Sequence, residues 1–165
     1  MACSRFAVAI HLLTLATLAG ADGTGRSGGA PTSARMAESV GTNPVVVRRL
    51  LGLLREAGLV TSRAGPGGGW RTTGPPEGTT LLDVYRAVTC DSVLPLADAD
   101  AAGACPIGRE VHRALDAVVA EAQAAMERGL AAVSLADILA DVRAGCPGCE
   151  VGPVASTTRL AGEAP

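Results

Sequence analysis

Only three of the 165 residues are aromatic, and this scarcity limits the folds that the chain can adopt. They are Phe6, Trp70 and Tyr85, so a hydrophobic core must consist of Leu, Val, Ile and Ala. Strands are usually rich in β-branched and aromatic residues, whereas Leu and Ala favour helices. Hydrophobic residues make up 48% and charged residues 18% of the chain, which argues against disorder throughout. We therefore expect one mainly α domain with room for a tail.

The charges are divided unevenly along the chain. All 14 basic residues are arginine, whose always-charged guanidinium suits phosphates and base edges. Residues 1–75 carry eight arginines against three acids, a net charge of +5, and residues 76–165 carry six against thirteen, a net charge of −7. This asymmetry indicates that the first half binds a polyanion and that the second half is acidic. The overall charge of −2 therefore does not exclude nucleic acid as a partner.

The N-terminus has two interpretations. The segment from Phe6 to Ala19 is almost wholly apolar, follows Arg5 and precedes small residues, as in a signal peptide. His11 inside the segment argues against export, and the segment is too short to span a bilayer. The alternative is a first helix buried inside the fold.

A helix-turn-helix is predicted between residues 32 and 58. A short first helix begins at Thr32 or Ser33 and ends at Gly41, with Met36, Ala37 and Val40 facing inward. The second helix starts at Asn43-Pro44, because asparagine caps free backbone amides and proline suits the first helical position. It runs to about Ala57, and its apolar residues recur at helical spacing, namely Val47, Leu50, Leu51 and Leu54. Two helices joined by a short turn containing glycine are typical of this motif.

A two-stranded wing is predicted after the second helix. Residues 59–62 form a short strand, residues 65–69 (GPGGG) form a turn, and residues 70–72 form the returning strand. Trp70 at the base of this hairpin either stacks on nucleic acid or packs against the protein.

The second half of the chain is predicted to be helical. A helix begins near Thr79, and its apolar residues are Leu81, Leu82, Tyr85 and Val88. A helix of about 25 residues then runs from Pro106 to about Leu130, which is too long for so small a domain to cover. We expect its apolar stripe to meet its own copy in an isologous dimer. A last helix capped by Ser134 extends to Val142. The predicted organisation is a DNA-binding unit at 1–76, a linker helix, sensor loop and dimerisation helix at 77–143, and a disordered tail at 144–165.

Several of these segments resemble the Rrf2 family of bacterial winged helix-turn-helix transcriptional regulators. The matching stretches are SRFAV (4–8), TNPVVVRRLLGLLREAGLV (42–60), GPGGGW (65–70), TTLLDVYRAV (79–88) and CPIGR (105–109). The resemblance covers about residues 3–143. It implies that the apolar N-terminal segment is a helix of the fold, and that the protein is a cytoplasmic homodimer without catalytic activity. It also implies that two recognition helices lie in successive major grooves of a palindromic operator.

The resemblance assigns base reading to the start of the second helix. Arg48 is expected to donate two hydrogen bonds to a guanine, and Val45 to contact a thymine methyl. Thr42, Asn43 and Arg49 are better placed for phosphates, which fix register without reading sequence. The alternative is that Arg48 and Arg49 form a solvated helix face. The full set of expected DNA-binding residues is Arg5, Ser33, Thr42, Asn43, Val45, Arg48, Arg49, Arg63, Gly67 and Gly68.

The wing departs from the family's pattern. Family members carry a basic residue immediately before the glycine-rich turn, whereas this chain has Ala64 there and Arg63 one position earlier. Arg63 therefore reaches the minor groove by a different path, or the wing contributes less to binding.

Many family members bind an iron–sulfur cluster through three cysteines. Cys90 and Cys105 occupy the outer two of these positions, and the middle cysteine is absent. His11 is the candidate third ligand, since some members complete the cluster with a ligand from the first helix of the partner subunit. The cofactor is therefore either such a cluster on Cys90, Cys105 and His11, or none, with both cysteines as thiols and His11 as a core residue. The expected regulatory signal is a redox change, nitric oxide, iron or thiol stress.

A second class of function follows from Cys146-Pro147-Gly148-Cys149. A CxxC motif serves thiol oxidoreductases and redox switches, or supplies half of a zinc site. No thioredoxin-like βαβ pattern surrounds it, so the transcriptional regulator is the leading hypothesis and the thiol oxidoreductase is the alternative.

Overall fold

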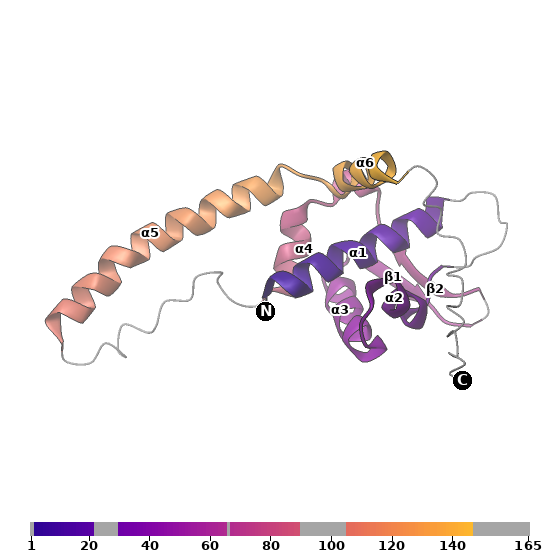
Figure 1. Ribbon diagram of the computed structural model, residues 1–165, viewed down its shortest axis with the longest axis horizontal. Helices are drawn as coiled ribbons and strands as arrows, with labels where there is room; N and C mark the ends of the chain where they lie inside the picture. The colour runs from indigo at the N-terminus through magenta and orange to yellow at the C-terminus, as the bar shows by residue number, and fades with distance from the viewer. Residues whose placement is uncertain (1, 22–29, 66, 90–104, 147–165) are drawn as a thin grey trace, which may run out of the picture.

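The structure, a computed structural model, describes residues 2–21, 30–65, 67–89 and 105–146 (Figure 1). The first helix, α1 (Ala2–Ala21), runs through the middle of the fold. It contacts four other helices: α2 (Ser33–Val40), α3 (Pro44–Glu56), α4 (Leu81–Val88) and α6 (Leu135–Gly145). Its buried residues include Ala9, Leu12, Leu13 and Ala16. The interpretation of the apolar segment as a buried first helix is therefore confirmed. In the described part of the chain, no helix is both long and apolar enough to cross a membrane.

The helix-turn-helix consists of α2 (Ser33–Val40) and α3 (Pro44–Glu56). Thr32, rather than Ser33, caps α2 by accepting a hydrogen bond from the Arg35 amide at 3.3 Å. Gly41 ends α2 with a φ of 69°, a left-handed conformation that glycine adopts without strain. Asn43 caps α3 by accepting a bond from the Val45 amide at 2.8 Å, and Pro44 follows. The predicted inward residues of α3 are all buried: Val47, Leu50, Leu51 and Leu54.

The wing is an antiparallel hairpin of β1 (Val60–Arg63) and β2 (Gly69–Thr72), with Val60 opposite Thr72 and Arg63 opposite Gly69. The free edge of β2 is tied to the segment before α2, because the Trp70 amide donates to the Pro31 carbonyl at 3.0 Å. At Gly69 an added Cβ would lie 1.9 Å from the Ala30 carbonyl oxygen, and φ is 147°. Only glycine fits there. Trp70 is half-buried and packs against the core, which favours the packing interpretation of this residue.

One hydrophobic core unites both halves of the chain. Helix α4 (Leu81–Val88) and helix α6 (Leu135–Gly145) contribute Val84, Val88, Leu135 and Leu139 to the cluster that α1 and α3 also line. The expected boundary at residue 76 therefore does not separate two cores. Helix α6 continues to Gly145, two residues past the expected boundary at residue 143. The tail beyond Cys146 lies outside the described residues.

Backbone hydrogen bonds join the N-terminal end of α4 to the N-terminal end of α6. An isolated antiparallel bridge pairs Thr80 with Ser134. The Leu81 amide donates to the Val133 carbonyl at 2.9 Å, and the Leu135 amide donates to the Thr79 carbonyl at 2.8 Å. This bridge fixes the C-terminal end of the preceding helix, α5 (Pro106–Ala131), against the core. The short 3₁₀ turn η1 (Pro76–Gly78) leads into it.

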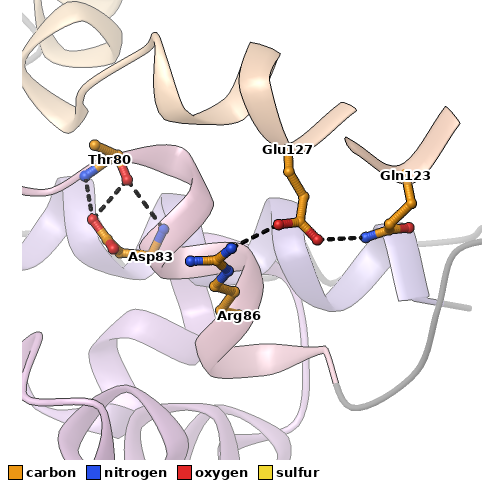
Figure 2. A network of polar contacts seen from close by, with 5 residues as sticks. All are labelled: Thr80, Asp83, Arg86, Gln123 and Glu127. Atoms are coloured by element: carbon orange, nitrogen blue, oxygen red, sulfur yellow. Dashed lines mark hydrogen bonds and ion pairs between the residues drawn. The ribbon is translucent and has the colours of Figure 1, made fainter. Parts of the chain in front are cut away.

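Both joined helices begin with a capping box, in which a hydroxyl and a carboxylate satisfy each other's backbone amides. In α4 the Asp83 carboxylate accepts from the Thr80 hydroxyl at 2.6 Å and from the Thr80 amide at 2.9 Å (Figure 2). These bonds hold the pKa of Asp83 below its usual value, with a smaller contribution from the Arg86 charge. The equivalent bonds from Ser134 lower the pKa of Asp137.

We expect Asp83→Asn to lower the melting temperature at pH 7, because the amide is a poorer acceptor for the capping bonds. A carboxyl whose folded pKa is depressed stabilises the fold above its unfolded pKa, near 4, and this contribution is lost as the pH falls further. The difference between wild type and variant should therefore shrink below about pH 4 in thermal unfolding curves. Asp141→Asn, an exposed position of α6 outside the capping box, is the matched control. A constant difference across the pH range would contradict this explanation.

Helix α5 (Pro106–Ala131) leads away from the rest of the fold, and its C-terminal part lies beside α4 (Figure 1). At this junction Arg86 of α4 pairs with Glu127 at 2.7 Å, and Gln123 donates to the same carboxylate at 2.9 Å (Figure 2). These hydrogen bonds and the Arg86 charge lower the pKa of Glu127. None of the residues of α5 is buried in the described structure.

Candidate nucleic-acid interface

The exposed face of α3 is set by its buried face. Because Val47, Leu50, Leu51 and Leu54 point into the core, Val45, Arg48 and Arg49 are left exposed. Val45 is 61% exposed. Val45 and Arg49 are one helical turn apart, so their side chains are neighbours on the same face. This face combines a guanidinium donor with an apolar side chain.

No other described residue neutralises the charge on this face. Arg48 and Arg49 form no ion pair with another described residue, whereas arginines of α4 and α5 do. Arg55 on the last turn of α3 is also exposed. An exposed helix with free guanidinium groups attracts a polyanion such as the phosphate backbone of DNA.

The other expected phosphate contacts lie around the same helix-turn-helix. Asn43 is exposed, and its side-chain oxygen is used in capping, so its amide group is left to donate outward. Thr42 is half-buried in the turn, and Ser33 is the first residue of α2 and also half-buried. Arg5 is exposed on α1, a different element from the rest of the set.

The backbone conformation of the wing turn itself requires glycine. Gly67 has a φ of 74°, and the Gly68 amide donates to the Gly65 carbonyl at 2.9 Å. A Cβ at Gly68 would lie 2.2 Å from the Arg63 carbonyl oxygen. The turn therefore requires these glycines whether or not DNA is bound. Arg63 is exposed at the end of β1, beside this turn.

The residues expected to hold a cluster are not assembled in the described part of the chain. Nε2 of His11 lies 3.2 Å from the Ser39 hydroxyl, so the ring links α1 to α2. Cys105 is an exposed free thiol at the start of α5, and Cys90 lies outside the described residues. Among the described residues, no group of three His, Cys, Asp or Glu side chains could hold a metal ion. The structure therefore describes only two of the three expected ligands, Cys105 and His11, and the cluster stays a prediction.

The cysteines of the CxxC motif are only partly described. Cys146 follows α6 and is in a disulfide, and Cys149 lies outside the described residues. Tyr85, by contrast, lies in the core as expected, with its ring edge-to-face against Phe6 at 6.0 Å between centroids.

Two residues of α3 were missed by the sequence reasoning. Val46 is 45% exposed beside Val45, so the start of the helix presents two apolar side chains to solvent. Gly52 lies in the middle of the helix, where its missing side chain leaves open space. The signal for both was available, because each falls outside the apolar spacing that defines the buried face.

Comparisons with known proteins identify what this arrangement is similar to. The family model Rrf2, described as an iron-dependent transcriptional regulator, matches residues 3–141. YwnA of Bacillus subtilis (strain 168), named provisionally as an HTH-type transcriptional regulator, is 40% identical over 137 residues, which cover 82% of this chain and 95% of YwnA. A solved structure described provisionally as a DNA binding protein is 40% identical, with a TM-score of 0.63, over 82% of this chain and 98% of that one. The structure of T. potens IscR shares the fold, with a TM-score of 0.61 at 20% identity over 86% of this chain and 87% of its own.

Proposed function

The chain belongs to the Rrf2 family of transcriptional regulators, and we propose that it binds a palindromic DNA operator as a homodimer in the cytoplasm, by recognition rather than catalysis. The observation that carries this proposal is the exposed face of α3. Val45, Arg48 and Arg49 stand on a capped, rigidly packed helix, and neither arginine is neutralised by a described residue. A helix of this kind fits the major groove, which is wide enough to admit it.

Dimerisation is supported by the apolar stripe of α5. We define this α5 stripe as Ile107, Val111, Leu115 and Val118, whose side chains are between 44% and 75% exposed. The four residues recur at spacings of three and four, so they line one side of the helix. Such an exposed stripe marks a protein–protein interface. A second copy is its natural partner, because an isologous contact buries the same stripe on both subunits.

The expected roles on DNA follow from side-chain chemistry. Arg48 donates two hydrogen bonds to guanine O6 and N7, and Val45 contacts a thymine methyl. Arg49, Thr42 and Asn43 bind phosphates and set the register. The backbone at Gly67 and Gly68 contacts the sugar–phosphate backbone from the wing, and Arg63 reaches the minor groove. Ser33 and Arg5 add contacts from α2 and α1.

A binding titration tests this function. We expect a duplex selected by the protein from a random pool to bind with an affinity that falls steeply with salt, since each phosphate contact releases counterions. A variant truncated after Ala144 should bind equally well, because its α3, wing and α5 stripe are intact. Affinity that does not change with salt, or binding that is lost with the tail, would refute the proposal. The alternative based on Cys146 and Cys149 instead requires a thiol–disulfide exchange activity that is lost in Cys149→Ala and does not depend on DNA binding.

Two hypotheses for how the regulator senses its signal follow from the cysteines. Either Cys90, Cys105 and His11 hold an iron–sulfur cluster, or the two cysteines act as thiols and His11 is a core residue. Iron and sulfide analysis after anaerobic purification, with iron and sulfide supplied, distinguishes them. Iron and sulfide lost in Cys105→Ala support the cluster. Iron-free protein that still binds its operator supports thiols or regulation without an effector.

A further inference from the structure

Nothing in the described fold of the isolated chain requires glycine at position 52. It is the ninth of the 13 residues of α3, and glycine is the least favourable residue in a helix interior after proline. Its φ is not among the positive values that require glycine. A Cβ added at Gly52 would meet nothing within 4 Å, so close packing does not require glycine either. Gly68 and Gly69, by contrast, are each required by a neighbouring backbone.

Gly52 lies on the face of α3 that carries the exposed residues. It follows Val45 by seven residues and Arg49 by three, and both spacings place residues on the same side of a helix. The core lies on the other side, with Leu51 and Leu54 buried. The gap left by the missing side chain therefore opens outward, on the side of the helix that also carries position 49.

We propose that Gly52 is a positioning residue for DNA, an inference that rests on the proposed function. A helix with its side chains is about 10–12 Å across, and the major groove is about 12 Å wide, so the fit is tight. Without a Cβ at residue 52, the backbone of α3 lies closer to the edges of the bases. This closer approach lets the shorter side chain of Val45 reach a base while Arg48 reaches a guanine.

The test uses a substitution with opposite effects on folding and on binding. Gly52→Ala should raise the melting temperature of the free protein by about 3 °C, because alanine favours the helix. It should also weaken binding to the selected duplex by about tenfold, comparable to the loss of one base contact. Gly52→Leu should weaken binding further while the protein stays folded. The matched control is Gly145→Ala at the end of α6, where an added Cβ also meets nothing within 4 Å. Its affinity for the duplex should not change.

Each outcome of this experiment either supports or overturns the proposal about Gly52. A more stable Gly52→Ala protein with weaker binding, beside an unchanged Gly145→Ala protein, supports the inference. Unchanged affinity of Gly52→Ala overturns the inference, because DNA binding then does not need the gap. A lower melting temperature also overturns it, because the fold itself then requires glycine at this position. If the wild-type protein selects no duplex, the proposed function fails as well.

Discussion

Replacing Val111 and Leu115 together by glutamate is expected to convert the protein into monomers and to weaken operator binding by about a hundredfold or more. Both residues lie on the α5 stripe and are exposed in the single chain, so the substitution costs the monomer little. In a dimer it would bury four like charges in an apolar contact. A monomer loses the gain in effective concentration that two linked recognition helices provide.

Sedimentation velocity and a binding titration check this expectation. The matched control is Ala120→Glu, an exposed position on the opposite side of α5 from the stripe. This control should remain dimeric and bind normally. Circular dichroism should show the same helix content in all three proteins. A doubly substituted protein that is still dimeric would show that the stripe is not the dimer interface.

Removing the guanidinium of Arg48 is expected to cost sequence preference rather than only affinity. We expect Arg48→Ala to lose about 1–3 kcal/mol of discrimination, about 5- to 150-fold, at one base pair in each half-site. The reason is that a bidentate contact to guanine is lost, while the phosphate contacts remain. The measurement is the affinity of wild type and variant for the selected duplex and for duplexes changed at each position.

Two other arginines of α3 provide contrasts for this experiment. Arg49→Ala should weaken binding to all duplexes similarly and reduce the salt dependence by about one counterion, as expected for a phosphate contact. Arg55→Ala, on the last turn of α3, should have the smallest effect. If Arg48→Ala leaves the preference at every position unchanged, the assignment of the reading residue is wrong.

The elements of the fold follow from local patterns in the sequence. The spacing of Val47, Leu50 and Leu51, together with the Asn43-Pro44 start, predicts α3 within one residue of its observed end. The family resemblance, which the comparisons confirm, distinguishes a buried first helix from a signal peptide, since Phe6 to Ala19 is apolar in both cases. Ser134 was identified as a cap because its position before an apolar run is a local signal.

The long-range contacts could not be predicted from local sequence patterns. The bridge between Thr80 and Ser134 joins residues that are far apart in sequence, and no periodicity reports it. The hydrogen bond between His11 and Ser39 likewise depends on how α1 crosses α2, so the sequence could not predict it. For the same reason, the sequence could not show that α4 and α6 complete the core beneath α1.

Selection of duplexes from a random pool by the wild-type protein, followed by sequencing, tests most directly whether this regulator reads DNA as a symmetric dimer. We expect an inverted repeat whose half-sites are centred about one helical turn apart, or a multiple of it, each with a conserved guanine for Arg48. Enrichment of a single unrepeated motif, or of no motif at all, would contradict a dimer that places two α3 helices in successive major grooves.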